Sequence, residues 1–555
     1  MKTKTKGILF FAVVAGIMLT SGVTIAIPAA FFGDPNEVDT QIIADVGTGI
    51  PLDNYPPDQQ DQYCGTGEAM SNRYVKEYKI PTACTQPLAI TTDPDGTVWF
   101  AQTNSGNLAK FDPLTEKFTE FDNPVWDDYF QALSESVGEK IPARSMMWGI
   151  DYSSDGSIWY TDGYHDALWK FSISDESYDR LQYPNPEDTE GVFPQKLTVD
   201  GSRIIVNDLL GSRISFFEFA QVGQEIRTFA IPSPLENSIT SDFTIDSEDN
   251  VWYTTWIPDE TGILVKFDYP SYEIAQAESS PEWFSQGLLL QEFIEFYQFP
   301  PEMNTPNGIT VGPNQKIWIS DTSGNFFFSF DPETEEFTKY VTSIPHADSY
   351  GNLKLPTYSS NPYWIEHSDG NLVMNEHNAN RIAVFNPESE TMVEYTVPSR
   401  NPNWSDCEGI DYCGLSQVFD FTVDGSKIWF TEWVENNIGV VDTSATLPFT
   451  IDIDNQNIIL ERGQTAEVLL QFNIPNVLLG EGEVSASLNK SSTASSSDLI
   501  ITSEHTVLNS LVGDSQSYLI QITAGEDALS GTHKVLLGAF DDEIAISKFI
   551  TVTIV

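Results

Sequence analysis

The chain has 555 residues, of which 40% are hydrophobic and 12% aromatic, enough to bury a folded core and too many for a disordered protein. It carries 81 Asp and Glu against 27 Lys and Arg, a formal net charge of −54. An acidic excess of this size repels phosphate backbones, so the charge excludes nucleic acid as a main partner.

The first 33 residues predict export. Lys2, Lys4 and Lys6 precede an uncharged run from Gly7 to Gly33. Such a segment is either a secretory signal peptide or, if it is not cleaved, a membrane anchor that tethers the chain by its N-terminus. Both interpretations place the protein outside the cell or at its surface. Residues 34–62, rich in Asp, Pro and Gln, are expected to form a flexible acidic leader.

One motif recurs seven times. Each copy has an apolar strand, a turn rich in Asp and Gly, and a second strand with a central aromatic residue, as in ITTDPDGTVWFAQ and FTVDGSKIWFTE. The aromatic residue or its substitute falls at Trp99, Trp159, Ile205, Trp252, Trp318, Val373 and Trp429. Two further strands with period-2 alternation follow most copies. Four strands per repeat predict an all-β protein with a seven-bladed β-propeller over residues 63–445.

The seventh copy lacks its fourth strand, and a matching strand lies upstream. The segment YVKEYKIP, residues 74–81, has the fourth-strand pattern and precedes the first blade. We therefore expect this segment to close the ring against blade seven and so remove an open sheet edge.

The four cysteines are an even number with no metal-binding spacing, which in an exported protein favours two disulfides. Two simple pairings stay open. One joins Cys84 to Cys413 across the ring closure and Cys64 to Cys407, and the other joins neighbours in sequence, Cys64 to Cys84 and Cys407 to Cys413.

After about residue 446 the pattern changes to short alternating strands. These predict an immunoglobulin-like β-sandwich over residues 446–555. Sandwich domains of this kind mostly mediate contacts or act as spacers, so the two expectations for this domain are a protein partner and a spacer role. Two N-glycosylation sequons also occur, at Asn403 (N-W-S) and Asn489 (N-K-S).

Acidic residues recur three positions after the motif aromatic. Asp321, Glu376 and Glu432 occupy this position in consecutive blades. If equivalent positions share one height in the ring, these carboxylates form a belt that suits Mg²⁺ or Ca²⁺. The alternative interpretation is that each acid caps a strand end within its own blade.

Two further sets are candidates for chemistry in the central channel. Lys196, Asp242 and Asp420 lie on the inner strands and are expected to line the channel as an internal ion pair or, alternatively, to supply a base. His377 adjoins Glu376 and is the best candidate for a catalytic base or metal ligand, with a surface histidine as the alternative.

The phrases DGTVWFAQTNSGNLAKFDP, DGSKIWFTEWVENNIGVVD and DGNLVMNEHNANRIAVFNP resemble blades of the virginiamycin B lyase-like (streptogramin lyase) family. The resemblance covers residues 74–443 and implies a seven-bladed ring with a Mg²⁺-assisted elimination that opens a cyclic lactone. Glu376 and Glu432 match the family's acidic position. The family's P-H-(A/G)-I segment reads QPLAI, TPNGI, NPYWI and QVFDF here, without histidine.

Two functions follow from these observations. The first is an exported propeller that binds a small molecule or surface polymer at the cell surface. The second is a metal-dependent lyase or lactonase that acts on a cyclic ester at the channel mouth.

Overall fold

The computed structural model describes residues 51–126, 145–184, 191–219, 227–258, 260–278, 290–353, 358–410, 412–476 and 482–555. The predicted export segment, residues 1–33, and residues 34–50 of the predicted leader lie outside this range. Among the residues described, no helix is long and apolar enough to cross a membrane.

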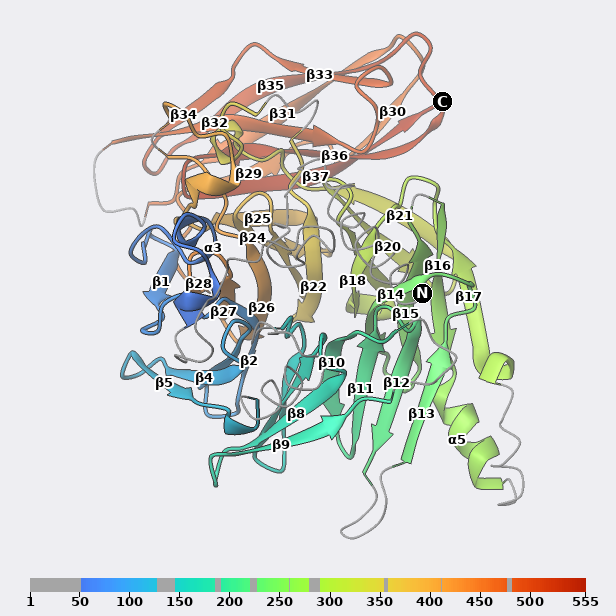
Figure 1. Ribbon diagram of the computed structural model, residues 1–555. Coiled ribbons are helices and arrows are strands. Elements are labelled where there is room, and N and C mark those ends of the chain that lie inside the picture. The colour runs from blue at the N-terminus through green and yellow to red at the C-terminus, as the bar shows by residue number, and fades with distance from the viewer. Residues whose placement is uncertain are drawn as a thin grey trace.

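Seven four-stranded antiparallel units are arranged in a ring (Figure 1). The all-β propeller predicted from the repeats is therefore confirmed. The first four blades run from the inner to the outer strand as β2 (Pro87–Thr92), β3 (Val98–Gln102), β4 (Asn107–Asp112), β5 (Lys117–Phe121); β6 (Ile150–Ser153), β7 (Ser157–Asp162), β8 (Ala167–Ser172), β9 (Ser177–Gln182); β10 (Pro194–Asp200), β11 (Arg203–Asp208), β12 (Arg213–Glu218), β13 (Arg227–Pro232); and β14 (Ile239–Ile245), β15 (Val251–Ile257), β16 (Thr261–Phe267), β17 (Ile294–Gln298).

Blades five to seven complete the ring. Their strands are β18 (Pro306–Val311), β19 (Ile317–Asp321), β20 (Phe326–Asp331), β21 (Glu336–Val341); β22 (Pro362–Ser368), β23 (Asn371–Glu376), β24 (Arg381–Asn386), β25 (Thr391–Thr396); and β26 (Val418–Asp424), β27 (Lys427–Glu432), β28 (Asn437–Asp442), with β1 (Val75–Lys79) as the fourth strand. β1 pairs antiparallel with β28, so the predicted closure is confirmed. Apolar side chains of blades seven and one, including Trp429 and Phe111, pack together beneath it.

The recurring turn explains why the motif folds as a hairpin. In blade one, Asp93 accepts hydrogen bonds from the backbone N–H groups of Asp95 and Thr97, and its other oxygen accepts from Trp99 Nε1 at 2.9 Å. In blade four, Asp246 binds Trp252 Nε1 in the same way at 2.8 Å. The aspartate thus fixes the turn and the buried aromatic ring together.

The helices of the described residues are short and lie before the first strand or between strands. They are η1 (Pro51–Asn54), α3 (Gln60–Tyr63), α5 (Tyr269–Glu278), η2 (Leu290–Phe293), η3 (Pro313–Gln315), η4 (Ala347–Ser349) and η5 (Pro402–Trp404).

The C-terminal strands form two sheets that share an apolar core. One sheet has the order β29 (Thr450–Ile453), β31 (Thr465–Asn473), β35 (Ser515–Ala524), β33 (Leu499–Ser503). The other contains β37 (Ile544–Ile554), β36 (Gly531–Phe540), β32 (Glu483–Ser492), β34 (Val507–Leu511), with β30 (Asn457–Leu460) parallel to β37.

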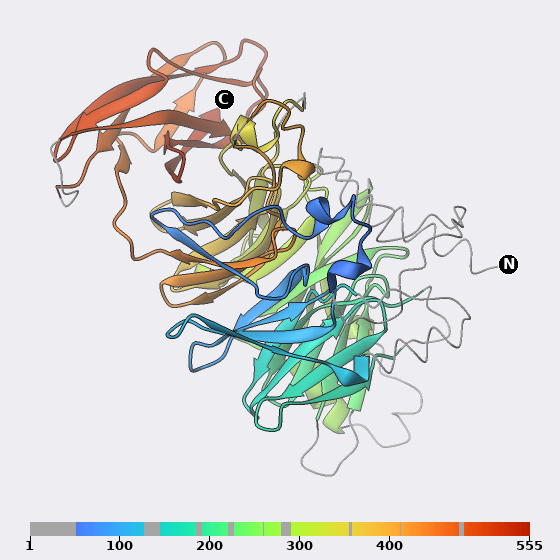
Figure 2. The same cartoon turned by 60° about the vertical axis from the view of Figure 1, so that its left-hand side comes forward.

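This second sheet is continuous with blade six. β37 pairs antiparallel with β25, from Thr391 opposite Lys548 to Tyr395 opposite Ile544. The sandwich therefore lies at the rim of the ring, where Figure 2 shows it beside the outer strand of blade six. Residue 446 separates the two domains along the sequence. In the structure, however, the last strand, β37, belongs to the same sheet as blade six.

Candidate functional site

The central channel contains the ion pair expected from the inner-strand residues. Lys196 Nζ lies 2.9 Å from Asp420 Oδ1 and 4.4 Å from the centroid of the Trp364 ring. Both polar side chains are largely buried. The Lys196 cation is therefore held by one carboxylate and one aromatic face.

Aspartates also tie three of the inner strands to the next blade. Asp420 accepts from Ile90 N at 3.1 Å, joining blade seven to blade one. Asp242 accepts from Ile309 N at 3.3 Å, and Asp151 accepts from Val199 N at 2.7 Å. Asp242, predicted to line the channel, is thus a link between blades four and five.

Among the residues described, the acidic side chains that interact with Lys196 outnumber it. Burial raises the pKa of Asp242 to about 7 and that of Glu366 to about 7, and the nearby Lys196 lowers both only in part. Burial likewise raises the pKa of Asp151 to about 6. Near neutral pH these groups therefore share protons as well as the lysine charge.

His377 lies in an aromatic cluster. Its ring centroid is 5.6 Å from that of Tyr363 and 5.2 Å from that of Phe419, and Trp148 stacks on Tyr363 at 5.8 Å. Burial lowers the pKa of His377 to about 3, so the imidazole is neutral at pH 7. His377 does not lie against Glu376 as a catalytic pair. Its Nδ1 has no hydrogen-bond partner among the residues described.

The three acids predicted to bind a metal do not meet. Asp321 accepts from the backbone N–H groups of Asn304 and Thr305 at 3.1 and 3.0 Å, which is the capping role given as the alternative. Glu376 is ion-paired with Arg381 at 2.5 Å. The described part of the chain contains no group of three or more His, Cys, Asp or Glu side chains that could hold a metal ion. A shared belt of Asp321, Glu376 and Glu432 therefore does not fit these positions.

Glu432, unlike Glu376, is not ion-paired with a basic side chain among the residues described. It is fully buried, and its Oε2 accepts from Asn437 Nδ2 at 3.1 Å. Burial and the neighbouring Glu77 carboxylate raise the pKa of Glu432 well above its usual range. Sequence reasoning missed Glu77 and Arg381. The signal for Arg381 is its spacing, because residues five apart across this hairpin lie directly opposite each other, as Glu376 and Arg381 do.

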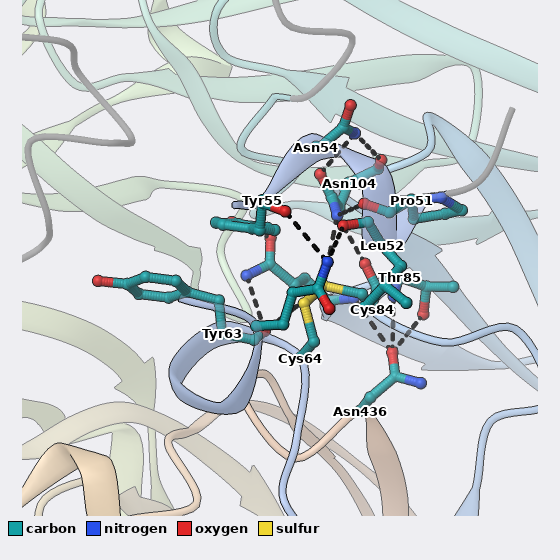
Figure 3. Close-up of a disulfide and its surroundings, with 12 residues drawn as sticks. Pro51, Leu52, Asn54, Tyr55, Tyr63, Cys64, Cys84, Thr85, Asn104 and Asn436 are labelled. Carbon is teal, nitrogen blue, oxygen red and sulfur yellow. Dashed lines mark hydrogen bonds between the residues drawn. A yellow bond between two sulfur atoms is a disulfide. The ribbon is translucent and has the colours of Figure 1, made fainter. Parts of the chain in front are cut away.

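The N-terminal segment packs on the ring, which corrects the prediction of a flexible leader for residues 51–62. Tyr55 is 2% exposed and stacks on Tyr63 at 5.0 Å. Asn104 Nδ2 donates to the carbonyl oxygens of Pro51 and Cys84 (Figure 3). The interactions are long-range, and composition alone does not reveal them.

Both disulfides join neighbours in sequence, Cys64 with Cys84 and Cys407 with Cys413. The first attaches the N-terminal segment to blade one (Figure 3). Disulfides are typical of proteins outside the reducing cytosol, so they are compatible with export.

The two sequons differ in accessibility. Asn403 is exposed, and its Nδ2 donates to the Asp61 carbonyl at 3.2 Å. Asn489 is 5% exposed, and its Nδ2 donates to the hydroxyls of Ser343 and Ser547. Since Nδ2 is the atom that a glycan would modify, the folded protein does not present Asn489 for glycosylation.

A pocket of about 70 Å³ opens between blade six and the sandwich. The guanidinium of Arg400 lies 4.7 Å from the Tyr412 ring centroid, and its Nη1 donates to Ser349 Oγ at 3.3 Å. Arg400 Nε is buried and has no partner among the residues described. His346, Asp541 and the exposed Tyr412 also line the pocket, which no sequence motif indicated.

Comparison with known proteins gives likenesses of fold. No family model matches the chain, and no curated protein matches it. Among solved structures, virginiamycin B lyase from Staphylococcus aureus is 20% identical, with a TM-score of 0.47 over 66% of this chain and 98% of that one. A streptogramin B lyase is 19% identical, with a TM-score of 0.47 over 67% and 99%. YCF48 bound to D1 peptide is 8% identical, with a TM-score of 0.39 over 70% and 98%. The lyases named by the blade motifs are thus among the structural neighbours.

Proposed function

We propose that this chain is an exported cell-surface protein that binds a small molecule or the end group of a surface polymer in the pocket between blade six and the sandwich. Arg400 carries the proposal. Its guanidinium lines the pocket beside the Tyr412 ring, where it can meet an anionic group of a ligand. A pocket of about 70 Å³ takes an end group and not a whole polymer.

The lining of the pocket favours a carboxylate that also carries donor groups. A guanidinium stacked on an aromatic ring is held in place to receive a carboxylate. Asp348, Asp541 and Asp542 line the same pocket and would accept from hydroxyl or ammonium groups of the ligand. Uronic acid residues and amino acids combine both features.

The channel supports this function over the alternative. A metal-dependent lyase or lactonase needs an open mouth with converging ligands. Here Lys196 is paired with Asp420 and lies on the Trp364 ring, and the Tyr363, Phe419 and His377 rings pack against one another.

Calorimetric titration of the purified protein with uronic acid oligosaccharides and with neutral oligosaccharides tests the proposal. We expect binding of the uronic acids only, weakened at least tenfold by Arg400→Gln. Arg462→Gln is the matched control, because Arg462 is an exposed arginine of the sandwich. Equal binding by Arg400→Gln would refute ligand binding in this pocket. Mg²⁺-dependent opening of a cyclic ester would support the lyase alternative.

Export is tested separately. Cell fractionation and N-terminal sequencing of the mature protein should place it outside the cytoplasm, either cut within residues 1–33 or retained at the membrane. Recovery of uncut protein in the cytosol would contradict this part of the proposal.

A further inference from the structure

Blade six neutralises two buried glutamates with an arginine. Glu376 ends β23, and Glu394 lies on β25. Arg381 Nε donates to Glu376 Oε2 at 2.5 Å, and its Nη2 lies 3.4 Å from Glu394 Oε1. One cation therefore lies between the two carboxylates, so both can carry a negative charge in the interior of the blade.

Blade one has the same two positions with a neutral donor. Gln102 ends β3, in the place of Glu376. Glu120 on β5 has the register of Glu394 on β25. Gln102 Nε2 donates to Glu120 Oε1 at 2.6 Å. In this blade the side chain that ends the second strand therefore supplies the hydrogen that the carboxylate on the fourth strand accepts.

Blade seven has a glutamate at both positions. Glu432 ends β27, and Glu77 lies on β1 in the register of Glu394. Asn437 takes the place of Arg381, and its Nδ2 donates to Glu432 Oε2 at 3.1 Å. The carboxyl groups of Glu77 and Glu432 are hydrogen-bonded to each other. Because a carboxylate can only accept, this hydrogen bond needs a proton on one of the two glutamates.

The surroundings indicate which glutamate holds the proton. Glu77 accepts from the backbone N–H groups of Ser399 at 2.9 Å and Met70 at 2.7 Å, and from the Ser399 hydroxyl. Three donors stabilise a negative charge on Glu77. Glu432 is 0% exposed and has Asn437 as its one donor among the residues described. Burial and the Glu77 carboxylate raise the pKa of Glu432 well above its usual range, so Glu432 is the group that carries the proton.

The other titratable groups around the pair do not replace this proton. Glu435, on the turn between β27 and β28, adds a further acidic group near Glu432. Lys79 on β1 donates its Nζ to the carbonyl oxygen of Glu435 at 2.7 Å, and its charge acts on the Glu435 carboxylate. The segment after blade six presents the uncharged Ser399 to Glu77. Loss of the proton would therefore leave two negative charges in contact in the interior.

We propose that the Glu77–Glu432 pair is a pH-sensitive switch of the ring closure: one shared proton keeps β1 paired in blade seven, and loss of this proton as the pH rises weakens the pairing. β1 is the edge strand of its blade and is paired with β28 alone. Moving β1 outward brings Glu77 into water and relieves the repulsion, while the other strands of the blade stay in place.

The sign of the pH dependence follows from the raised pKa of Glu432. The stabilisation by the shared proton is fully present below the ordinary glutamate pKa near 4.5 and is lost as the pH rises through the higher pKa of the folded state. The switch lies within blade seven and does not depend on the ligand pocket proposed above.

Hydrogen–deuterium exchange of the purified full-length protein at about pH 6 and about pH 9, corrected for intrinsic exchange rates, tests the proposal. We expect the amides of β1 to lose protection roughly tenfold or more at the higher pH. The amides of β5 are the internal reference, because β5 is also an edge strand and its glutamate is bound by Gln102 at every pH. Their protection should not change.

Glu432→Gln should remove the pH effect on β1, because glutamine supplies the donor that Gln102 supplies in blade one. Glu68→Gln is the matched control, since Glu68 is an exposed glutamate shortly before β1, and it should leave the effect unchanged. The proposal is overturned if β1 keeps its protection at about pH 9, or if Glu432→Gln loses protection as the wild type does. If Glu432→Gln does not fold, Asn437→Arg takes its place. This variant supplies the guanidinium of blade six and should also remove the pH effect.

Discussion

Blades six and seven bury the same two glutamates but neutralise them differently. In blade six an arginine from the next strand lies between the carboxylates, and in blade seven an asparagine stands in its place. The outer edges differ as well. β25 of blade six is paired with β37 of the sandwich, whereas β1, the outer strand of blade seven, comes from the other end of the chain.

Blades six and seven therefore share the positions of two buried glutamates, whereas the side chain that lies beside these glutamates differs between the two blades. Blade six is complete once its own hairpins and the sandwich strand have formed. Blade seven depends on a strand from the other end of the chain. The following substitutions test this contrast, in order of decreasing expected effect.

Arg381→Asn gives blade six the side chains of blade seven. Removing one partner of a buried ion pair typically costs roughly 3–5 kcal/mol, because the remaining charges stay buried. We expect a loss of this size in the free energy of unfolding by urea, measured in EDTA. Lys76→Asn, which removes the exposed partner of Glu116, should cost less than about 1 kcal/mol. Equal losses would show that the arginine does not balance blade six.

Ile546→Pro removes a backbone N–H donor from β37, the sandwich strand that pairs with β25 of blade six. Ile546 lies between Val393 of β25 and Ala539 of β36. Proline within a strand paired on both sides should cost roughly 3 kcal/mol or more. Thr119→Pro in β5 is the control, since that strand is paired on one side. Similar losses in the free energy of unfolding by urea for both variants would contradict the prediction that β37 contributes more than an edge strand.

Replacing Cys64 and Cys84 by serine tests the N-terminal segment that leads into β1. The disulfide closes a separation of 20 residues, so its loss should cost about 3 kcal/mol, and loss of Cys407–Cys413, with a separation of 6, about 2 kcal/mol. Thermal unfolding of the two double variants measures the difference. A larger effect for Cys407–Cys413 would contradict the role of the first disulfide in holding this segment.

Glu366→Gln removes from blade six an acid that shares Lys196 with Asp420 of blade seven. Because burial raises the pKa of Glu366 from its ordinary value near 4.5 to about 7, the folded state binds the proton more tightly than the unfolded state. This contribution is therefore present at pH 4 and is lost as the pH rises to about 7.

The free energy of unfolding should fall between pH 5 and pH 8 in the wild type. In the variant this fall should be smaller by on the order of 2 kcal/mol. Urea unfolding at both pH values measures the difference. Glu388→Gln changes an exposed glutamate of the same blade and should leave the pH dependence as it is. An unchanged slope in Glu366→Gln would mean that this carboxyl group titrates normally.

Most of the ring was predictable from sequence, because blade strands and turns are local features. The Asp and Gly turns, the central aromatic residue and the fourth-strand pattern at residues 74–81 were enough to predict seven blades and their closure. The channel ion pair of Lys196 and Asp420 followed from equivalent positions on the inner strands.

The remaining features depend on contacts between distant segments. Nothing local in residues 544–554 indicates that they pair with β25, since any alternating strand could extend a sheet edge. The packing of Tyr55 on the ring and the partnership of Glu77 with Glu432 are likewise long-range. The belt of acids was expected because equal repeat positions share one height, but their hydrogen bonds differ from blade to blade.

The pairing of β1 with β28 also bears on synthesis and translocation. The first strand of the ring must wait, unpaired, until almost all of the propeller has been made, and β25 must wait longer for β37. A chain that leaves the cell as an extended polymer meets this requirement, because folding can begin after both ends have crossed. Nascent chains stopped before residue 437 should therefore expose strand edges and bind chaperones that recognise them.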